Sequence, residues 1–166
     1  MSDLSNVGST HIAKLLFDDT TAWFIAIGEG DEAWDDLATV PEPAQTATGL
    51  VAHIGHFVAT AQYVTPAVNG AITTSASEKW DVSVAATRYI HLSAPIDYAD
   101  AVGETIRELA VYVDATPDTG HEAQTYLPVA DLAGLGTLLN QGRRSPVVRT
   151  IEDNGTLSLV FFVGEA

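Results

Sequence analysis

Two β-rich runs separated by an acidic turn constrain the fold more than any other stretch of this sequence. The runs are Arg88–Ala94 and Thr105–Asp114, and residues 95–104 between them are rich in acids and turn-forming residues. Because strand side chains alternate between two faces, the second run places three apolar side chains on one face: Leu109, Val111 and Val113. The first run offers a matching apolar face, so we expect the two strands to pair antiparallel as the structural centre.

The length and composition indicate one folded domain, residues 1–166. With 46% hydrophobic residues in 166, the chain can bury a substantial core. Its formal net charge of −15 argues against binding to nucleic-acid backbones or to anionic membrane surfaces. The absence of cysteine excludes disulfides, thiolate metal sites and thiol catalysis.

The beginning of the chain predicts a short helix followed by a buried strand. Ser5–Ser9 supplies capping side chains, and Ile12, Leu15 and Leu16 have the spacing of one helical face. The apolar run Ala22–Ile27 then ends in a glycine-acid turn, as a buried strand does. No signal peptide or membrane-spanning run is apparent, so we expect a soluble protein that is made in the cytoplasm.

The middle of the chain has mixed signals for secondary structure. Residues 31–45 predict a surface loop with Trp34 as its anchor. In Thr46–Val64 the positions of Leu50, Ile54 and Phe57 fit a helix while the later residues favour a strand. We expect a short helical turn followed by a strand, and then a mobile loop or an edge segment over Ala71–Ser77.

The C-terminal third predicts a strand over Gly134–Asn140, a turn over Asn140–Gly142 and a final hairpin. In the hairpin, Val147–Ile151 and Thr156–Val163 flank an Asn-Gly turn. The predicted class is therefore α+β. A short N-terminal helix packs on a mainly antiparallel β-sheet or β-sandwich that ends in a C-terminal β-hairpin.

Histidines provide one candidate for chemistry. His53 and His56 stand three positions apart, a spacing that places two metal ligands on one helical face, with His11, His91 or His121 as a third ligand. The sequence shows no second cluster with ligand spacing, so packed or exposed imidazoles are the alternative. We expect no metal and no cofactor.

Carboxylates provide the other candidate. The acidic turn contains three carboxylates, those of Asp97, Asp100 and Glu104. Carboxylates can bind a cation or act as an acid–base pair, although acids in a turn are commonly solvated. A small hydrolase that uses these carboxylates or the histidines is therefore one functional alternative. It requires the groups to converge in a concave pocket with shifted pKa values.

Two further features indicate contacts rather than catalysis. Arg107 and Glu108 place opposite charges inside a predicted strand, where they form either a cross-strand salt bridge or a subunit contact. In the last strand Val160 and Phe162 make the second face apolar, so either the fold or a partner subunit covers it.

Several of these segments together resemble tail-collar fibre and baseplate proteins of tailed bacteriophages. The resemblance includes an N-terminal helix that opens with Asn6-Val7-Gly8 and a strand that ends in Gly28-Glu29-Gly30-Asp31. It also includes Ile106–Val113, where Ala110 replaces the glycine usual in the family's strand, and the later Arg144-Ser145-Pro146. The resemblance covers most of the chain and rests on structural turns and strands.

This resemblance implies a non-enzymatic virion structural protein of the tail or baseplate. It implies an adaptor that attaches tail fibres or joins baseplate components in symmetric copies, with other virion proteins as partners. A tail-tube or tube-capping protein, whose acids would line a channel, is an alternative. The predicted contact residues are Arg107, Glu108, Tyr112, Arg144, Arg149, Val160 and Phe162.

Overall fold

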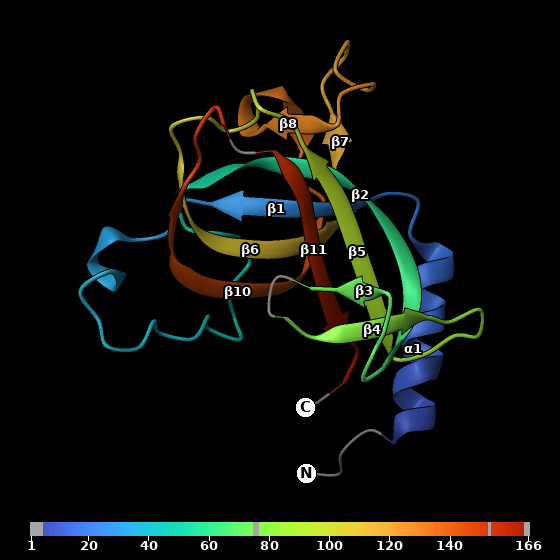
Figure 1. Cartoon of the computed structure of the whole chain (residues 1–166). Coiled ribbons are helices and arrows are strands. Elements are labelled where there is room, and N and C mark those ends of the chain that lie inside the picture. The colour runs from blue at the N-terminus through green and yellow to red at the C-terminus, as the bar shows by residue number, and fades with distance from the viewer. Residues whose placement is uncertain (1–4, 75–76, 153, 165–166) are drawn as a thin grey trace. The chain divides into compact units, whose positions relative to one another are not determined.

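A computed structural model describes residues 5–74, 77–152 and 154–164 of the chain (Figure 1). Its contacts divide into two compact units that interleave along the sequence. The helical unit comprises Met1–Thr21, Thr60–Ser93 and Leu157–Ala166, and the sheet unit comprises Ala22–Ala59 and Ala94–Thr156. The prediction of a single domain stays a prediction, and each unit is described by itself.

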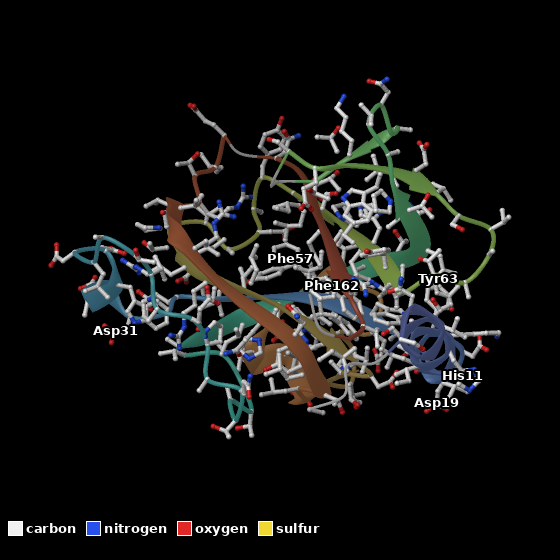
Figure 2. The ribbon with its side chains drawn as sticks, turned by 90° about the horizontal axis from the view of Figure 1, so that it is seen from below. His11, Asp19, Asp31, Phe57, Tyr63 and Phe162 are labelled. Carbon is white, nitrogen blue, oxygen red and sulfur yellow. The ribbon has the colours of Figure 1, made fainter. Side chains whose placement is uncertain are left out.

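The helical unit contains the only α-helix of the described residues. Helix α1 (Asn6–Asp19) begins at Ser5, whose hydroxyl accepts a hydrogen bond from the Gly8 amide at 3.2 Å. Phe17 of α1 packs on Tyr63, with ring centroids 4.5 Å apart, and Figure 2 shows Tyr63 beside the helix. The predicted N-terminal helix and its cap are therefore confirmed.

The buried face of α1 differs from the predicted apolar face. Ser9 and Ala13 are buried, whereas Ile12 and Leu15 are exposed. The reason is close packing, since a Cβ at Gly164 would approach the Ser9 hydroxyl to 2.6 Å. Small side chains let the C-terminal segment lie near the helix, and large side chains at these positions would hold it away.

Five strands complete the helical unit. The second half of β2 (His53–Pro66) pairs antiparallel with β4 (Lys79–Val82) and β5 (Tyr89–Ile96). Strand β3 (Ile72–Thr73) adds to β4, and β11 (Gly155–Phe162) pairs with β5. Strand β3 falls within the predicted edge segment, of which Ser75 and Ala76 lie outside the described residues.

The sheet unit is built around β1 (Trp23–Gly28), in which every residue is buried. Strand β1 pairs antiparallel with the first half of β2 on one side and with β6 (Thr105–Val113) on the other. Strand β10 (Thr137–Val148) adds to β6, and β8 (Tyr126–Pro128) adds to β2. The sheet unit also contains a short antiparallel pair, formed by β7 (Thr116–Pro117) and β9 (Leu132–Gly134). Two 3₁₀ helices complete the unit, η1 (Glu32–Trp34) and η2 (Val129–Asp131).

One face of this sheet carries an apolar cluster. It consists of buried side chains from β1, β6, β8 and the residue range between β6 and β7: Phe24, Ala26, Ala110, Tyr112, Ala115 and Leu127. Leu50, Leu132 and Leu138 pack against this cluster. The segment that precedes β2 therefore shares a core with the central strands.

Both predicted runs of the opening two-strand unit are strands, but they are not partners. Strand β5 pairs with β2 and β11, while β6 pairs with β1 and β10. The prediction of a β5–β6 pair was wrong because alternation identifies the apolar face of a strand without identifying the strand beside it. Buried β1 occupies the place next to β6.

The predicted C-terminal hairpin is not formed among the described residues. Strands β10 and β11 flank its Asn-Gly turn, yet β10 pairs with β6 and β11 pairs with β5. The predicted turn at Asn140–Gly142 lies inside β10, where long-range pairing to β6 outweighs local turn preference. Asp153 of the Asn-Gly segment lies outside the described residues.

The helical turn expected before residue 64 is also wrong in part. Ile54 and Phe57 lie in β2, which begins at His53, and Phe57 is buried. The coarser class is confirmed, with one short N-terminal helix packed on a mainly antiparallel β-structure. Within the described ranges, no helix combines the length and the hydropathy that crossing a membrane requires.

Candidate interaction surface

The long segment between β1 and β2, residues 29–52, is the most distinctive part of the sheet unit. Two backbone hydrogen bonds close its base, from the Glu29 amide to the Ala52 carbonyl at 2.9 Å and from the Gly30 amide to the Val51 carbonyl at 3.1 Å. Figure 1 shows the segment extending to the side of β1 and β6, and Figure 2 shows Asp31 at its outer part. Beyond these backbone hydrogen bonds the segment pairs with no described strand, and side chains from β6 and β10 hold it in place.

Arg107 of β6 holds the first part of this segment. Its guanidinium makes a bidentate ion pair with Asp35, through Nε to Oδ1 at 2.8 Å and Nη2 to Oδ2 at 2.7 Å. Its Nη1 also donates to the Glu29 carbonyl at 3.1 Å. The hydrogen bond from Arg107 lowers the pKa of Asp35, and the same bond raises the pKa of Arg107.

Glu108 holds the end of the segment. Its Oε2 accepts a hydrogen bond from the Val51 amide at 2.7 Å, and its Oε1 accepts from Nε of Arg143 at 3.4 Å. Glu108 is 1% exposed and lies directly opposite Arg143 in the β6–β10 ladder. The predicted cross-strand salt bridge is thus confirmed for Glu108, with Arg143 as its partner.

Arg143 of β10 connects Glu108 to the middle of the segment. Its guanidinium carbon lies 4.1 Å from the centroid of the Trp34 ring, and its Nη1 donates to the carbonyls of Pro41 at 3.0 Å and Glu42 at 3.2 Å. Because neighbouring side chains of a strand point to opposite faces, Arg107 and Glu108 secure different parts of the segment. Trp34, the predicted anchor of the surface loop, therefore packs against the Arg143 guanidinium.

A hollow of about 450 Å³ lies between this segment and β10. It is lined by residues of both elements: Glu42, Pro43, Ala44, Gln45, Ala47, Leu138, Leu139, Asn140 and Gln141. Among the described strands β10 pairs with β6 alone, so its other edge carries backbone groups that no strand satisfies. We call this hollow and edge the β10 groove. Such an edge accepts an added strand from another chain.

The predicted contact residues fall into two groups. Arg107, Glu108, Tyr112 and Arg149 are buried, and the partners found for the first two belong to this chain. Arg149 donates to the carbonyls of Asp97 and Asp100, at 3.0 Å and 3.3 Å, and so braces the acidic turn.

The other three candidates reach the surface. Arg144 and Phe162 are exposed, and Val160 is partly exposed. A contact role for the seven residues stays a prediction. The sequence analysis did not identify Arg143 and Asp35 as the partners of Glu108 and Arg107. The adjacent basic residues Arg143 and Arg144 were the signal that could have pointed to Arg143.

The candidate metal pair His53 and His56 lies on β2 instead of a helix. The two rings are 4.8 Å apart, and the Tyr112 ring lies 5.5 Å and 4.8 Å from them. Burial, with a contribution from neighbouring His53, lowers the pKa of His56 to about 3, and burial also lowers the pKa of His53. Both imidazoles are therefore neutral at pH 7.

The remaining histidines have other surroundings. His91 hydrogen-bonds to Gln62 at 3.1 Å and to Ser158 at 2.9 Å, His121 lies 3.1 Å from Asp131, and His11 is exposed on α1. Within the ranges that the structure describes, no group of three or more His, Cys, Asp or Glu side chains is arranged to hold a metal ion.

The acidic turn between β5 and β6 does not join the histidine pair in a site. The Asp97 amide donates to the Asp100 carboxylate at 2.7 Å, and the Glu104 carbonyl accepts from the Arg149 amide at 2.9 Å. Asp100 lines an open hollow with Tyr126 and Asp131, where burial and nearby carboxylates raise the pKa of Tyr126 to about 12. The convergence that the hydrolase alternative requires is absent from the described hollows.

A family of known proteins matches nearly the whole chain. Residues 1–163 match the model of a family described as "Baseplate wedge 3 tail fiber network component". No curated protein matches the chain.

Proposed function

We propose that this chain, which belongs to the family of baseplate wedge 3 tail fiber network components, acts as a structural adaptor that joins tail fibres to baseplate proteins. The match confirms the resemblance to phage tail fibre and baseplate proteins. The chain is accordingly a bacteriophage baseplate component, located in the virion tail. The adaptor role, its non-catalytic nature and its symmetric copies are the proposed part.

The single observation that supports an adaptor is the β10 groove. An edge strand with a free hydrogen-bonding side lies next to a hollow that a partner's side chains can fill. Backbone pairing to the edge supplies affinity, while the hollow supplies specificity. The proposed partner therefore adds an extended segment along β10.

Hydrogen bonds within the chain order the segment that forms one wall of the groove. Arg143, paired with Glu108, donates to the carbonyls of Pro41 and Glu42, and Glu42 lines the groove. A wall that is ordered before binding loses less conformational entropy when a partner docks. Two interruptions of the β6–β10 register, after Leu138 and after Arg143, disfavour indiscriminate edge-to-edge pairing.

Photo-crosslinking in assembled tails tests the proposal. A photoreactive residue at exposed Asn140, inside the groove, is expected to crosslink to a fibre or baseplate protein. The same residue at Val84, which is fully exposed in the helical unit, is the matched control. Crosslinks from position 84 without crosslinks from position 140 would contradict a partner in the β10 groove.

A further inference from the structure

The further inference concerns Arg88, which precedes β5 in the helical unit. The chain has seven basic residues, and several have carboxylate partners, including Lys14 with Asp18, Arg107 with Asp35 and Arg143 with Glu108. Arg88 is partly buried, and within the described residues the one hydrogen bond of its side chain joins Nη1 to Oδ1 of neutral Asn6 at 3.1 Å. No carboxylate of the described residues forms an ion pair with it, although the protein has a net charge of −15.

Aromatic rings hold the guanidinium in place. Its central carbon lies 5.0 Å from the centroid of the Tyr89 ring and 5.7 Å from that of Phe162. Such contacts stabilise a cation and restrict its rotamers. Nε of Arg88 is buried and has no acceptor in the described residues. The buried Nε–H is therefore a donor that a bound acceptor could satisfy.

Arg88 lines a hollow of about 250 Å³ in the helical unit. Its other lining residues include the side chains of Asn6, Thr10, Thr65, Thr87 and Tyr89. The Thr87 hydroxyl is already committed to the Val64 carbonyl at 2.8 Å, whereas Thr10 and Thr65 have hydroxyls directed by no hydrogen bond between described residues. The hollow thus combines a planar cation with two available hydroxyls.

We propose that this hollow binds a carboxylate side chain of a partner protein. The flat fork of a guanidinium matches the two oxygens of a carboxylate, and the threonine hydroxyls supply further donors. The volume suits one side chain, and the strongly negative chain repels a polyanion such as nucleic acid. The Arg88 hollow is separate from the β10 groove and extends the proposed adaptor role by giving it a second contact.

Titration of the full chain with glutarate tests the carboxylate site. We expect saturable NMR shifts at the amides of Thr87 and Tyr89, with binding in the millimolar range, on the order of a single charge-assisted contact. Neutral glutaramide should give no saturable shift. Arg88→Gln should abolish the response, and Arg144→Gln, which removes an exposed arginine outside the hollow, should preserve it. Equal shifts from glutarate and glutaramide would overturn the proposal.

Two additional probes exclude other occupants. Inorganic phosphate that binds as tightly as glutarate would make the hollow a general anion site and overturn carboxylate selectivity. Asp3 and Glu165 lie outside the described residues, so the doubly neutralised variant Asp3→Asn/Glu165→Gln is titrated as well. Binding that occurs only in that variant would mean that the chain fills its own hollow.

Incorporation into tails tests the partner. Arg88→Gln should lower the amount of this protein in purified tails at least tenfold relative to Lys79→Gln, which removes an exposed basic residue of β4 outside both the hollow and the β10 groove. Equal incorporation of the two variants would overturn a partner's carboxylate at Arg88. The crosslinks from position 140 remain a separate readout, so failure at Arg88 does not decide the β10 groove.

Discussion

Segment 29–52 and helix α1 both lie outside the strands, and the chain secures them in opposite ways. Side chains that carry buried charge hold the segment, namely Arg107, Glu108 and Arg143. Helix α1 has its own backbone hydrogen bonds and buries only Ser9 and Ala13. A loop without regular structure needs specific polar partners for its backbone, whereas a helix satisfies its own. The segment should therefore be the more sensitive of the two to single charge changes.

The replacement Glu108→Ala should cause the largest loss of stability among the variants considered. It removes the carboxylate partner of Arg143 and the acceptor of the Val51 amide, so the free energy of unfolding should fall by about 3 kcal/mol. Urea denaturation measures the loss, and hydrogen exchange should show faster exchange in residues 29–52 than in α1. Arg144→Ala is the exposed control and should change stability by less than about 0.5 kcal/mol. Equal losses in the two variants would refute buried-charge anchoring.

Acid should destabilise the protein through His56. Its pKa is about 3 in the folded protein, below the ordinary value of 6.5, so the unfolded chain takes up the proton first as pH falls. The stabilising contribution is complete above pH 6.5 and decreases toward pH 3, with a loss of about 2 kcal/mol by pH 5. Urea denaturation at pH 7 and pH 5 measures it.

The variant His56→Phe should remove most of this pH dependence while it keeps an aromatic ring in the cluster. His11→Phe changes an exposed imidazole on α1 and serves as its control. An unchanged pH slope in His56→Phe would show that other groups cause the acid sensitivity.

Trp34→Ala should loosen the segment by a smaller amount. Loss of the ring over Arg143 should cost about 1–2 kcal/mol, because a partly buried cation–π contact is removed. Exchange of the amides in η1 should accelerate. Trp34→Phe retains a ring and should recover more than half of the loss, and a variant no better than alanine would argue against the stacking contact.

The smallest effect should come from the helix. Ser5→Ala removes the acceptor for the Gly8 amide and should cost about 0.5–1 kcal/mol, with faster exchange confined to the first turn of α1. Ser5→Asp preserves the acceptor and should be nearly neutral. A loss in Ser5→Ala as large as that in Glu108→Ala would remove the contrast between the two regions.

Local patterns predicted the elements better than their partners. The helix cap near Ser5 and the buried strand β1 were predicted correctly, because capping and burial depend on neighbouring residues. The final hairpin was misassigned because the Asn-Gly signal describes a turn and carries no information about the edges of β5 and β6. His53 and His56 were assigned a helical spacing, but both lie on β2, where His56 is buried and His53 is partly buried.

The candidate site was predicted in part. Arg107 and Glu108 were singled out because charges inside a strand require partners, and that reasoning led to the correct strand. Asp35, seventy-two positions before Arg107, was beyond local reasoning, as was the Trp34–Arg143 contact. No sequence spacing indicates which loop residue folds back onto a strand.

Local sequence patterns were enough to predict the helix, most of the strands and the acidic character, because periodicity, capping and composition act over a few residues or over the whole chain. The likeness to phage tail proteins rested on the turn and strand motifs of the sequence. Long-range pairing established three further facts: β5 and β6 take different partners, β10 is an edge among the described strands, and Asp35 and Glu108 are the carboxylates that pair with Arg107 and Arg143. Pairing depends on burial shared between distant segments, and this sharing is fixed only when the chain has folded.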